Sequence, residues 1–347
     1  LTGYPAVSSN APALWTDYDL TMRRIASLID ASTEEISIEI YAVAWDRTTA
    51  PVFAALQRAV DRGVHVRLLF DHIGSQKYPG FRQLKKRLTA IGVDWHVMLP
   101  LDPLHGRWRR PDLRNHRKIL VVDNRVAFSG SRNCADMAFA IKPRFAPWVD
   151  ILMSVEGPVV RQFQSVFLGD WMSYTGKDLG YMLQPVEPVA DPGDIAQVIP
   201  TGPDRRQGSI SDCLSGMLHA ARDRVVITTP YYVPDTALDA AVRAAARRGV
   251  EVTMILPARN DSIVVGATSQ GFYYGLLAAG ARILLFQDGL LHSKIMTVDG
   301  RMGMVGSANL DRRSFELNYE VNMAVFDRDF IEELDARQES YAERARE

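Results

Sequence analysis

The feature that most constrains this sequence is a short motif that occurs twice. One copy lies at residues 116–133 and the other at 292–309, and both fit His-x-Lys-x4-Asp-x6-Gly-Ser-x-Asn without a gap. The shared residues are His116, Lys118, Asp123, Gly130, Ser131 and Asn133 in the first copy, and His292, Lys294, Asp299, Gly306, Ser307 and Asn309 in the second. So many identities in two copies are hard to obtain by chance. The sequence therefore indicates two equivalent half-sites that work together.

Each copy is predicted to begin on a buried strand, because mostly β-branched apolar residues follow Lys118 and Lys294. Side chains alternate between the two faces of a strand, so His116 and Lys118 should point the same way. Asp123 should face the opposite side, as should Asp299, and we interpret both as structural carboxylates. The Gly-Ser pairs are predicted to end a second short strand, where small residues let the following Asn amide approach an anion.

The segments before the two motifs predict one order of elements that occurs twice. In the first half we expect helices over 17–31, 50–62 and 81–90 and strands over 35–43, 64–70 and 93–97. In the second half we expect strands over 225–229, 248–252 and 281–286 and helices over 236–247 and 271–279. Gly92 aligns with Gly280 at an offset of 188, but the motif histidines differ by 292 − 116 = 176, so a loop over 99–114 adds about twelve residues to the first half. This alternation indicates an α/β fold with helices covering a mixed sheet in each half.

The composition limits the size of the fold and the choice of partners. A chain of 347 residues, 47% of them hydrophobic, suits two domains or one duplicated domain. The net charge of −1 offers no overall attraction for nucleic acid. Cys134 and Cys213 lie far apart, which implies no disulfide framework and allows a reducing compartment. No apolar run is long enough to span a bilayer. Since residue 1 is Leu, we expect a processed or shortened chain whose N-terminal anchor can be missing.

The motif residues suit reactions of a phosphodiester. Because a phosphodiester is an anion, side chains that act on it must place positive charge and hydrogen-bond donors at its non-bridging oxygens, each donor contributing about 10²- to 10³-fold in rate. The candidates are Lys118, Lys294, Asn133, Asn309, Ser131 and Ser307. One neutral imidazole can attack phosphorus, and a second, protonated imidazole can donate its proton to the leaving alkoxide. The other histidines have no metal-ligand spacing, and neither a glycine-rich phosphate loop nor paired metal carboxylates occur, so we expect no metal and no nucleotide cofactor.

The duplicated motif resembles that of the phospholipase D superfamily. More narrowly, residues 114–118 (Arg-Asn-His-Arg-Lys) and the long segment 306–320 are similar to bacterial cardiolipin synthases, and residues 1–5 resemble the segment that follows their N-terminal membrane helices. The resemblance implies a duplicated fold of two mixed β-sheets flanked by helices, related by a pseudo-twofold axis, with one active site between the halves. We expect the N-terminal half over 1–175, a Pro- and Gly-containing linker over 176–208, and the C-terminal half over 209–347.

The resemblance also implies roles for individual residues. By this resemblance the catalytic residues are His116, Lys118, Asp123, His292, Lys294 and Asp299. It makes His116 the nucleophile and His292 the general acid and base, although the internal symmetry by itself barely separates the two roles. Asp150, 34 residues after His116, and Glu320, 28 residues after His292, resemble the carboxylates that fix the second ring nitrogen of each histidine.

The implied activity is a phosphatidyl transfer between two phosphatidylglycerol molecules, which makes cardiolipin and releases glycerol at the cytoplasmic side of a bacterial cell membrane. Two other classes remain open. The same site could deliver the intermediate to water, as a phospholipase D or a nuclease does, or the chain could be a non-catalytic lipid-binding scaffold. The near-neutral charge argues against nucleic acid, and the two intact motifs argue against a scaffold.

A basic segment precedes the first motif and is the candidate contact with a membrane. It contains Arg107, Trp108, Arg109, Arg110, Arg114, Arg117 and Lys118. Each charge near an anionic membrane surface contributes about 1 kcal/mol, but a solvated loop is an equally good interpretation. The apolar residues within 139–148 form either an interfacial lip or part of the core.

Overall fold

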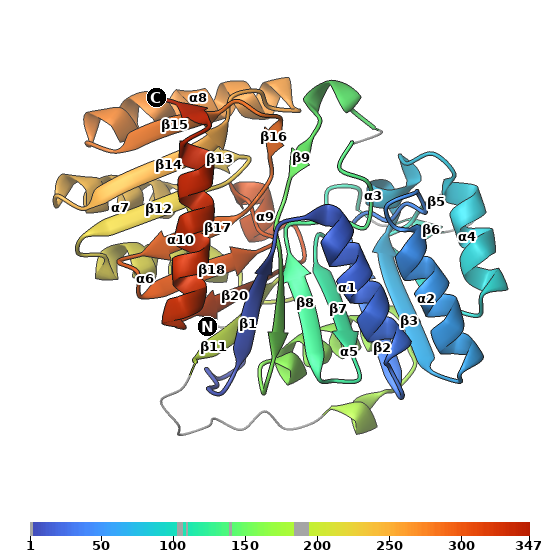
Figure 1. The fold of residues 1–347 in the computed structure, drawn as a ribbon. Helices are drawn as coiled ribbons and strands as arrows, with labels where there is room; N and C mark the ends of the chain where they lie inside the picture. The colour runs from blue at the N-terminus through green and yellow to red at the C-terminus, as the bar shows by residue number, and fades with distance from the viewer. Residues whose placement is uncertain (1–2, 103–106, 109, 139–140, 184–193) are drawn as a thin grey trace.

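The computed structural model describes residues 3–102, 107–108, 110–138, 141–183 and 194–347, with the backbone alone at 102, 107 and 108. The first half contains one mixed sheet (Figure 1). In spatial order its strands are β1 (Ala11–Trp15), β10 (Leu152–Glu156), β8 (Val126–Gly130), β7 (Lys118–Val122), β2 (Glu35–Ile40), β3 (His65–Asp71) and β4 (Asp94–Met98). The strands β2, β3 and β4 run parallel to one another, whereas the other neighbours are antiparallel.

The second half repeats this sheet strand by strand. Its order is β11 (Ala196–Thr201), β20 (Glu320–Val325), β18 (Met302–Gly306), β17 (Ile295–Val298), β12 (Arg224–Thr228), β14 (Glu251–Pro257), β15 (Arg282–Phe286) and β21 (Ala345–Arg346). The strands β12, β14 and β15 are the parallel ones, as β2, β3 and β4 are in the first sheet. The predicted α/β class with two mixed sheets in a duplicated arrangement is therefore confirmed, with β21 added at one edge.

Helices cover both faces of each sheet. On the first sheet, α1 (Tyr18–Asp30), α2 (Ala50–Asp61) and α4 (Phe81–Ala90) lie on one face and α5 (Val160–Thr175) on the other. On the second, α6 (Ser209–Ala220), α7 (Thr236–Arg247) and α8 (Ile263–Ala278) lie on one face and α10 (Arg328–Ala342) on the other. Two short helices, α3 (His72–Gln76) and α9 (Arg312–Glu316), follow strands near the junction of the halves. None of the described helices is long and apolar enough to cross a membrane.

The two halves share one hydrophobic core. The side chains of Phe163 on α5 and Ile331 on α10 belong to the same cluster of buried residues as Ile119 on β7 and Ile295 on β17. One helix of each half also contacts an edge strand of the other half: α5 contacts β11, and α10 contacts β1. This exchange of contacts holds the two motifs in a fixed relation.

Four of the five predicted helices before the motifs occur within a few residues of their expected ends. Local signals explain this accuracy: Asp17 caps α1 by accepting the backbone N–H of Leu20, Pro51 lies in the first turn of α2, and Gly63 adopts a φ of 90° after it. The helix α8 begins at Ile263, eight residues before its predicted start at 271. Within the stretch 176–208 that was predicted as a linker, β11 forms an edge strand of the second sheet, so this part of the stretch is not a linker.

Candidate active site

The two motif histidines lie at equivalent places, just ahead of the strands β7 and β17. The sequence predicted that they lie on these strands, but each strand begins only after its histidine. The backbone N–H of His116 donates to the carbonyl of Tyr319 at 2.8 Å, and that of His292 donates to the carbonyl of Val149 at 2.9 Å. Each histidine is therefore anchored by a backbone hydrogen bond to the opposite half.

The carboxylates that orient the histidines also come from the opposite half. Nδ1 of His116 lies 2.9 Å from Oε2 of Glu320, and Nδ1 of His292 lies 2.8 Å from Oδ1 of Asp150. When the carboxylate accepts the Nδ1 proton, Nε2 of the neutral ring carries a lone pair. Both histidines line one cleft, so the structure brings together the two rings that the motif predicted. The crossing of the carboxylates was not predicted.

Further donors hold the two carboxylates. Asn318 donates Nδ2–H to Oε1 of Glu320 at 3.0 Å, and the Tyr18 hydroxyl donates to Oδ2 of Asp150 at 3.2 Å. Burial raises the pKa of Asp150, but the nearby His292 outweighs it, and the pKa falls to about 2. Burial also raises the pKa of Glu320, but His116 and Lys118 outweigh it and the pKa is lowered, so both carboxylates are ionised near neutral pH. Neither donor was predicted from the sequence. Tyr18 lies far from either motif, and nothing in the motif pattern singled out Asn318.

Ser131 and Ser307 were predicted to contact phosphate, and the structure corrects this. The Ser307 hydroxyl donates to Oε2 of Glu320 at 2.5 Å, and the Ser131 hydroxyl donates to the carbonyl of Ile151 at 3.2 Å. Both side chains are buried, and the described lining of the cleft contains neither. These hydroxyls support the strands and carboxylates behind the histidines.

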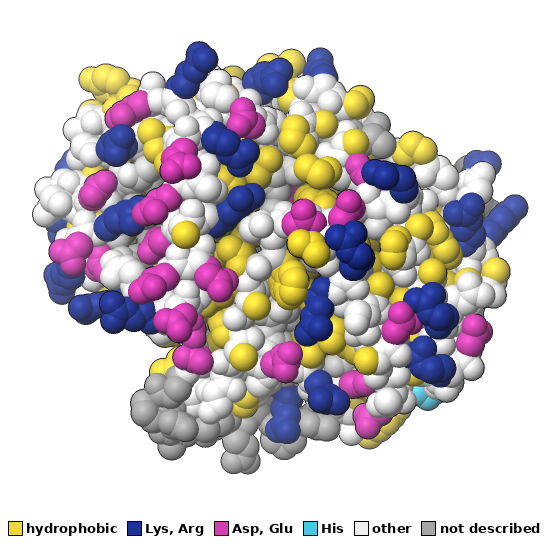
Figure 2. Space-filling model, viewed as in Figure 1, with side chains coloured by type: hydrophobic (Ala, Val, Ile, Leu, Met, Phe, Trp, Pro, Cys, Tyr) yellow, Lys and Arg dark blue, Asp and Glu magenta, His cyan; other side chains and the backbone are white. Residues whose placement is uncertain are grey.

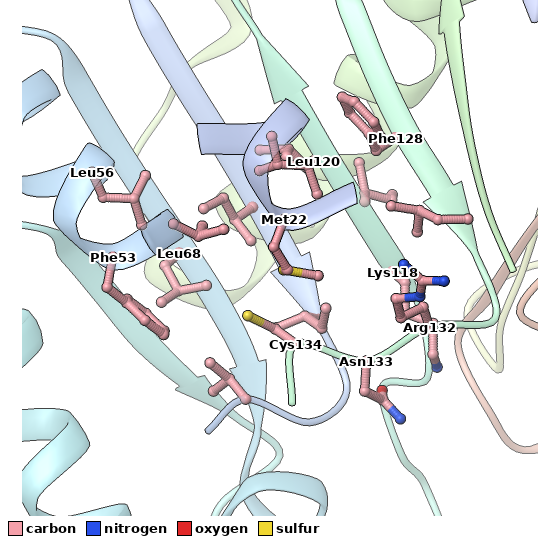
Figure 3. A pocket seen from close by; sticks show the side chains of 17 residues that line it. Met22, Phe53, Leu56, Leu68, Lys118, Leu120, Phe128, Arg132, Asn133 and Cys134 are labelled. Carbon is pink, nitrogen blue, oxygen red and sulfur yellow. The ribbon is translucent and has the colours of Figure 1, made fainter. Parts of the chain in front are cut away.

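Lys118 and Lys294 lie buried behind the histidines. Nζ of Lys118 donates to the carbonyl of His116 at 2.7 Å, and Nζ of Lys294 donates to that of His292 at 2.5 Å. Figure 3 shows Lys118 and Asn133 at the edge of an apolar cavity of about 70 Å³. Burial in these surroundings lowers the pKa of Lys118 to about 8 and that of Lys294 to about 7. An ammonium has three donors, so each lysine keeps donors beyond this backbone bond. The described lining of the cleft contains neither lysine, and their contact with a phosphate oxygen remains a prediction.

The cleft between the halves has a volume of about 470 Å³. His116, Asn133, His292 and Asn309 all line it. Among the described residues, the amide oxygens of Asn133 and Asn309 have no hydrogen-bond partner. Buried amide oxygens normally have one, so both atoms can accept a hydrogen bond from a ligand, whereas a contact with a phosphate oxygen would have to come from the Nδ2–H groups. Their assignment to phosphate binding remains a prediction.

An aromatic ring packs against each histidine. The Tyr41 ring meets the His116 ring edge-on at a centroid distance of 4.8 Å, and the Trp148 ring lies 4.4 Å from that of His292. Trp148 was interpreted as part of an interfacial lip or of the core, whereas it forms a wall of the cleft. Residues 139 and 140 of the same predicted lip lie outside the described residues.

Asp123 and Asp299 were grouped with the catalytic residues, and the structure assigns them a different role. Asp123 accepts the backbone N–H groups of residues 33–35 at 2.8 to 3.0 Å. Asp299 accepts those of residues 222–224 at 2.8 to 2.9 Å. They fix the turn before the strands β2 and β12, as the strand parity predicted for structural carboxylates.

The basic segment before the first motif is only partly described. Arg109 lies outside the described residues, and Arg107 and Trp108 are placed by their backbone, in β6 (Arg107–Trp108) paired with β5 (Leu101–Asp102). Arg110 is exposed and forms an ion pair with Asp112. Its assignment to a membrane contact remains a prediction.

Arg114 and Arg117 are buried, so neither a membrane contact nor a solvated loop describes them. Arg117 forms an ion pair with Asp170 and donates to the carbonyls of Glu320 at 3.1 Å and Thr201 at 3.0 Å. Because these carbonyls belong to the second half, Arg117 joins the halves directly beneath the cleft. Within the described ranges, no group of three or more His, Cys, Asp or Glu side chains has an arrangement that could hold a metal ion.

Comparison with known proteins identifies sequence relatives. The profile of the family described as "Cardiolipin synthase, PLD-like domain" matches residues 25–171 and 214–341. Cardiolipin synthase A of Pectobacterium carotovorum is 36% identical over 99% of this chain and 71% of that protein. Cardiolipin synthase A of Escherichia fergusonii is 34% identical over the same shares.

Solved structures share the fold. The phosphatidylserine synthase of Haemophilus influenzae aligns with a TM-score of 0.73 at 12% identity, over 99% of this chain and 89% of that chain. The polyphosphate kinase of Porphyromonas gingivalis aligns with a TM-score of 0.61 at 15% identity, over 95% of this chain and 50% of that one. At these identities the likeness concerns the fold alone.

Proposed function

Since this chain belongs to the phospholipase D superfamily and, within it, to the cardiolipin synthases, we propose that it transfers a phosphatidyl group between two phosphatidylglycerol molecules and releases glycerol. The observation that carries the proposal is the pair of equivalent histidines that face one cleft, each oriented by a carboxylate of the other half. A relative at 36% identity over nearly the whole chain supports the same activity.

The proposed reaction has two displacements at one phosphorus atom. In the first, Nε2 of His116 attacks phosphorus, the bond to the glycerol oxygen breaks, and His292 gives its proton to that oxygen. The product is a phosphatidyl group on His116 and free glycerol. In the second, His292 takes the proton of a hydroxyl of another phosphatidylglycerol, whose oxygen attacks phosphorus and displaces His116. Cardiolipin forms, and both histidines return to their first state.

The lysines and asparagines of the motifs suit the charge that this reaction develops. Asn133 and Asn309 line the cleft with the histidines, and Lys118 and Lys294 lie buried against the backbone of His116 and His292. Donors that are already in place where negative charge grows lower the barrier without reorganising in the transition state. Exposed Arg313 at the rim of the cleft can meet the second anionic headgroup.

Product analysis tests the proposal. The protein is incubated with vesicles that contain labelled phosphatidylglycerol, and the lipids are separated. Cardiolipin together with released glycerol supports phosphatidyl transfer. Phosphatidic acid as the main product would favour the second candidate, a phospholipase D-type hydrolase that uses the same site with water as acceptor.

The pKa values of the site predict a bell-shaped dependence of kcat/KM on pH. Burial lowers the pKa of His116 to about 4, so the nucleophile is protonated and inactive only below that pH. Burial also lowers the pKa of Lys294 to about 7 and of Lys118 to about 8, so positive charge is lost as the pH rises through these values. On the alkaline side the proton that His292 must donate is lost first, because burial lowers the pKa of His292 below its ordinary value. We therefore expect kcat/KM to fall near pH 4, and to fall on the alkaline side first with His292 and then with the lysines at pH 7 to 8. Assays with a soluble short-chain phosphodiester would measure this, and constant activity up to about pH 10, near the ordinary lysine pKa, would contradict it.

We place this activity at the surface of the bacterial cell membrane, on its cytoplasmic side. The free thiols of Cys134 and Cys213 fit a reducing compartment. The sequence-based candidate for the electrostatic contact remains the basic segment 107–110.

Replacing Arg107, Arg109 and Arg110 together by Ser is expected to weaken binding to vesicles rich in phosphatidylglycerol. Three charges at about 1 kcal/mol each correspond to a vesicle affinity roughly a hundredfold weaker than that of the parent. Added salt should reduce this difference between parent and variant, because salt screens charges over about 8 Å at physiological strength. Co-sedimentation with vesicles at several salt concentrations measures it. Turnover of a soluble phosphodiester should stay nearly unchanged, and a triple variant that binds like the parent would place the contact elsewhere.

A further inference from the structure

The helix α8 lies at the protein surface but carries no charged side chain. Residues 262–281 form a run of 20 positions without Lys, Arg, Asp or Glu. Since 23% of the chain is charged, about five charges (23% of 20) would be expected in such a run. A surface helix normally presents a polar or charged face to water. Contact with water alone therefore does not explain this composition.

The side chains that α8 exposes include large apolar ones. Ile263 is 82% exposed, Val264 75%, Tyr274 84% and Leu277 55%, whereas Leu276 packs into the core. Ile263, Tyr274 and Leu277 lie on one face of the helix, because the steps of 11, 3 and 14 residues between them return to nearly the same direction, and Val264 flanks this face. At a rise of 1.5 Å per residue they form a strip roughly 20 Å long. Figure 2 shows apolar side chains at the upper edge of the molecule, where Figure 1 places α8, with Lys and Arg side chains beside them.

The N-terminus of α8 lies at the mouth of the active-site cleft. The Ser262 side chain caps the helix by accepting the backbone N–H of Val265, and both residues line the cleft together with His116 and His292. Asp261, just before the cap, is held by an ion pair with Lys142 across the cleft mouth. The exposed strip therefore starts where a substrate would enter.

We propose that α8 docks on a lipid bilayer, with its exposed apolar strip (Ile263, Val264, Tyr274 and Leu277) buried at the level of the lipid headgroups. The proposal rests on the proposed function, because a phospholipid must pass from a membrane to the histidines. With 16 residues, α8 is shorter than the roughly 20 that a spanning helix needs, so it would contact the bilayer from its surface without crossing it. A bilayer fits better than a protein partner, since a bilayer over the strip brings the lipid substrate to the cleft mouth, whereas a protein in the same place would block it.

Two double variants with matched exposure test the proposal. Tyr274→Gln with Leu277→Gln changes α8, and Tyr181→Gln with Leu20→Gln changes a tyrosine that is 80% exposed and a leucine that is 55% exposed elsewhere. Gln is a good helix former, so both pairs should fold. Binding to mixed phosphatidylglycerol and phosphatidylcholine vesicles is measured by co-sedimentation at about 1 M salt, where charges are screened beyond about 3 Å. We expect the α8 pair to bind at least tenfold more weakly than the parent and the control pair to bind like the parent.

Each other outcome has a distinct meaning. A parent chain that does not bind at high salt, an α8 pair that binds like the parent, or an equal loss in the control pair would overturn the docking role. If the α8 substitutions instead dissolve a concentration-dependent dimer, the strip is an interface between copies and the proposal is wrong. Turnover of a soluble phosphodiester is measured in parallel and should be unchanged in both pairs. Absence of that turnover in the parent would refute the proposed function, whereas the vesicle result would still decide the role of α8.

Discussion

The substitution His116→Ala is expected to abolish both turnover and covalent labelling of the protein by a phosphatidyl donor. His292→Ala is expected to lose turnover but to retain the label. Without the His116 imidazole no nitrogen attacks phosphorus, so the intermediate cannot form. Without His292 the intermediate forms slowly, and it then persists because no base activates the acceptor. The loss of this acid–base catalysis should lower the rate by about 10²- to 10⁴-fold. Labelled phosphatidylglycerol vesicles and denaturing gels run at alkaline pH would reveal the bound label.

The electrostatics of the site are compatible with this assignment without requiring it. Burial lowers the pKa of both His116 and His292, so each ring is a potential nucleophile near neutral pH. Retention of label in His116→Ala together with its loss in His292→Ala would invert the two roles. Exposed His219 provides the matched control, and His219→Ala should label and turn over like the parent.

The duplicated motif predicted more of this site than any other feature of the sequence. Its spacing predicted that His116 and His292 meet at one cleft, because two copies of one unit pack about a pseudo-twofold axis. Strand parity predicted that Asp123 and Asp299 lie apart from the histidines, even though the histidines themselves precede the strands. Each aspartate also lies just past the far end of its strand, in a turn with a φ of 50° or 53°, so the length of the strand separates it from its histidine as well.

Two kinds of feature could not be predicted from the sequence. Helices with more than one buried side lose the polar face that periodicity detects: α5 packs against both the first sheet and β11, and its apolar residues surround it. The helix α8 also lacks a polar face, but for a different reason: its solvent-exposed side is itself apolar. Its start was therefore missed. Which carboxylate orients which histidine is decided by the packing between the halves. The spacing of residues along the chain does not predict that packing.

The crossed carboxylates give the second large prediction, because the effect of a substitution should follow the histidine that it orients. Glu320→Gln is expected to reduce turnover by about 10⁴-fold, the loss found when the carboxylate behind a catalytic histidine is neutralised. The neutral amide no longer fixes the tautomer in which Nδ1 carries the proton. Although Glu320 belongs to the second half, its loss should mimic His116→Ala and suppress labelling.

Asp150→Asn is the reciprocal variant and should mimic His292→Ala, with label retained and turnover lost. A pH profile separates orientation from a merely structural role. The Glu320 charge raises the pKa of His116, so in Glu320→Gln that pKa falls further below its value of about 4, and the acid limb should move to lower pH. Thermal unfolding of both variants checks that they remain folded. The opposite result, with label retained in Glu320→Gln and lost in Asp150→Asn, would contradict the prediction. It would show that the hydrogen bonds between the halves do not control the reactivity of the histidines.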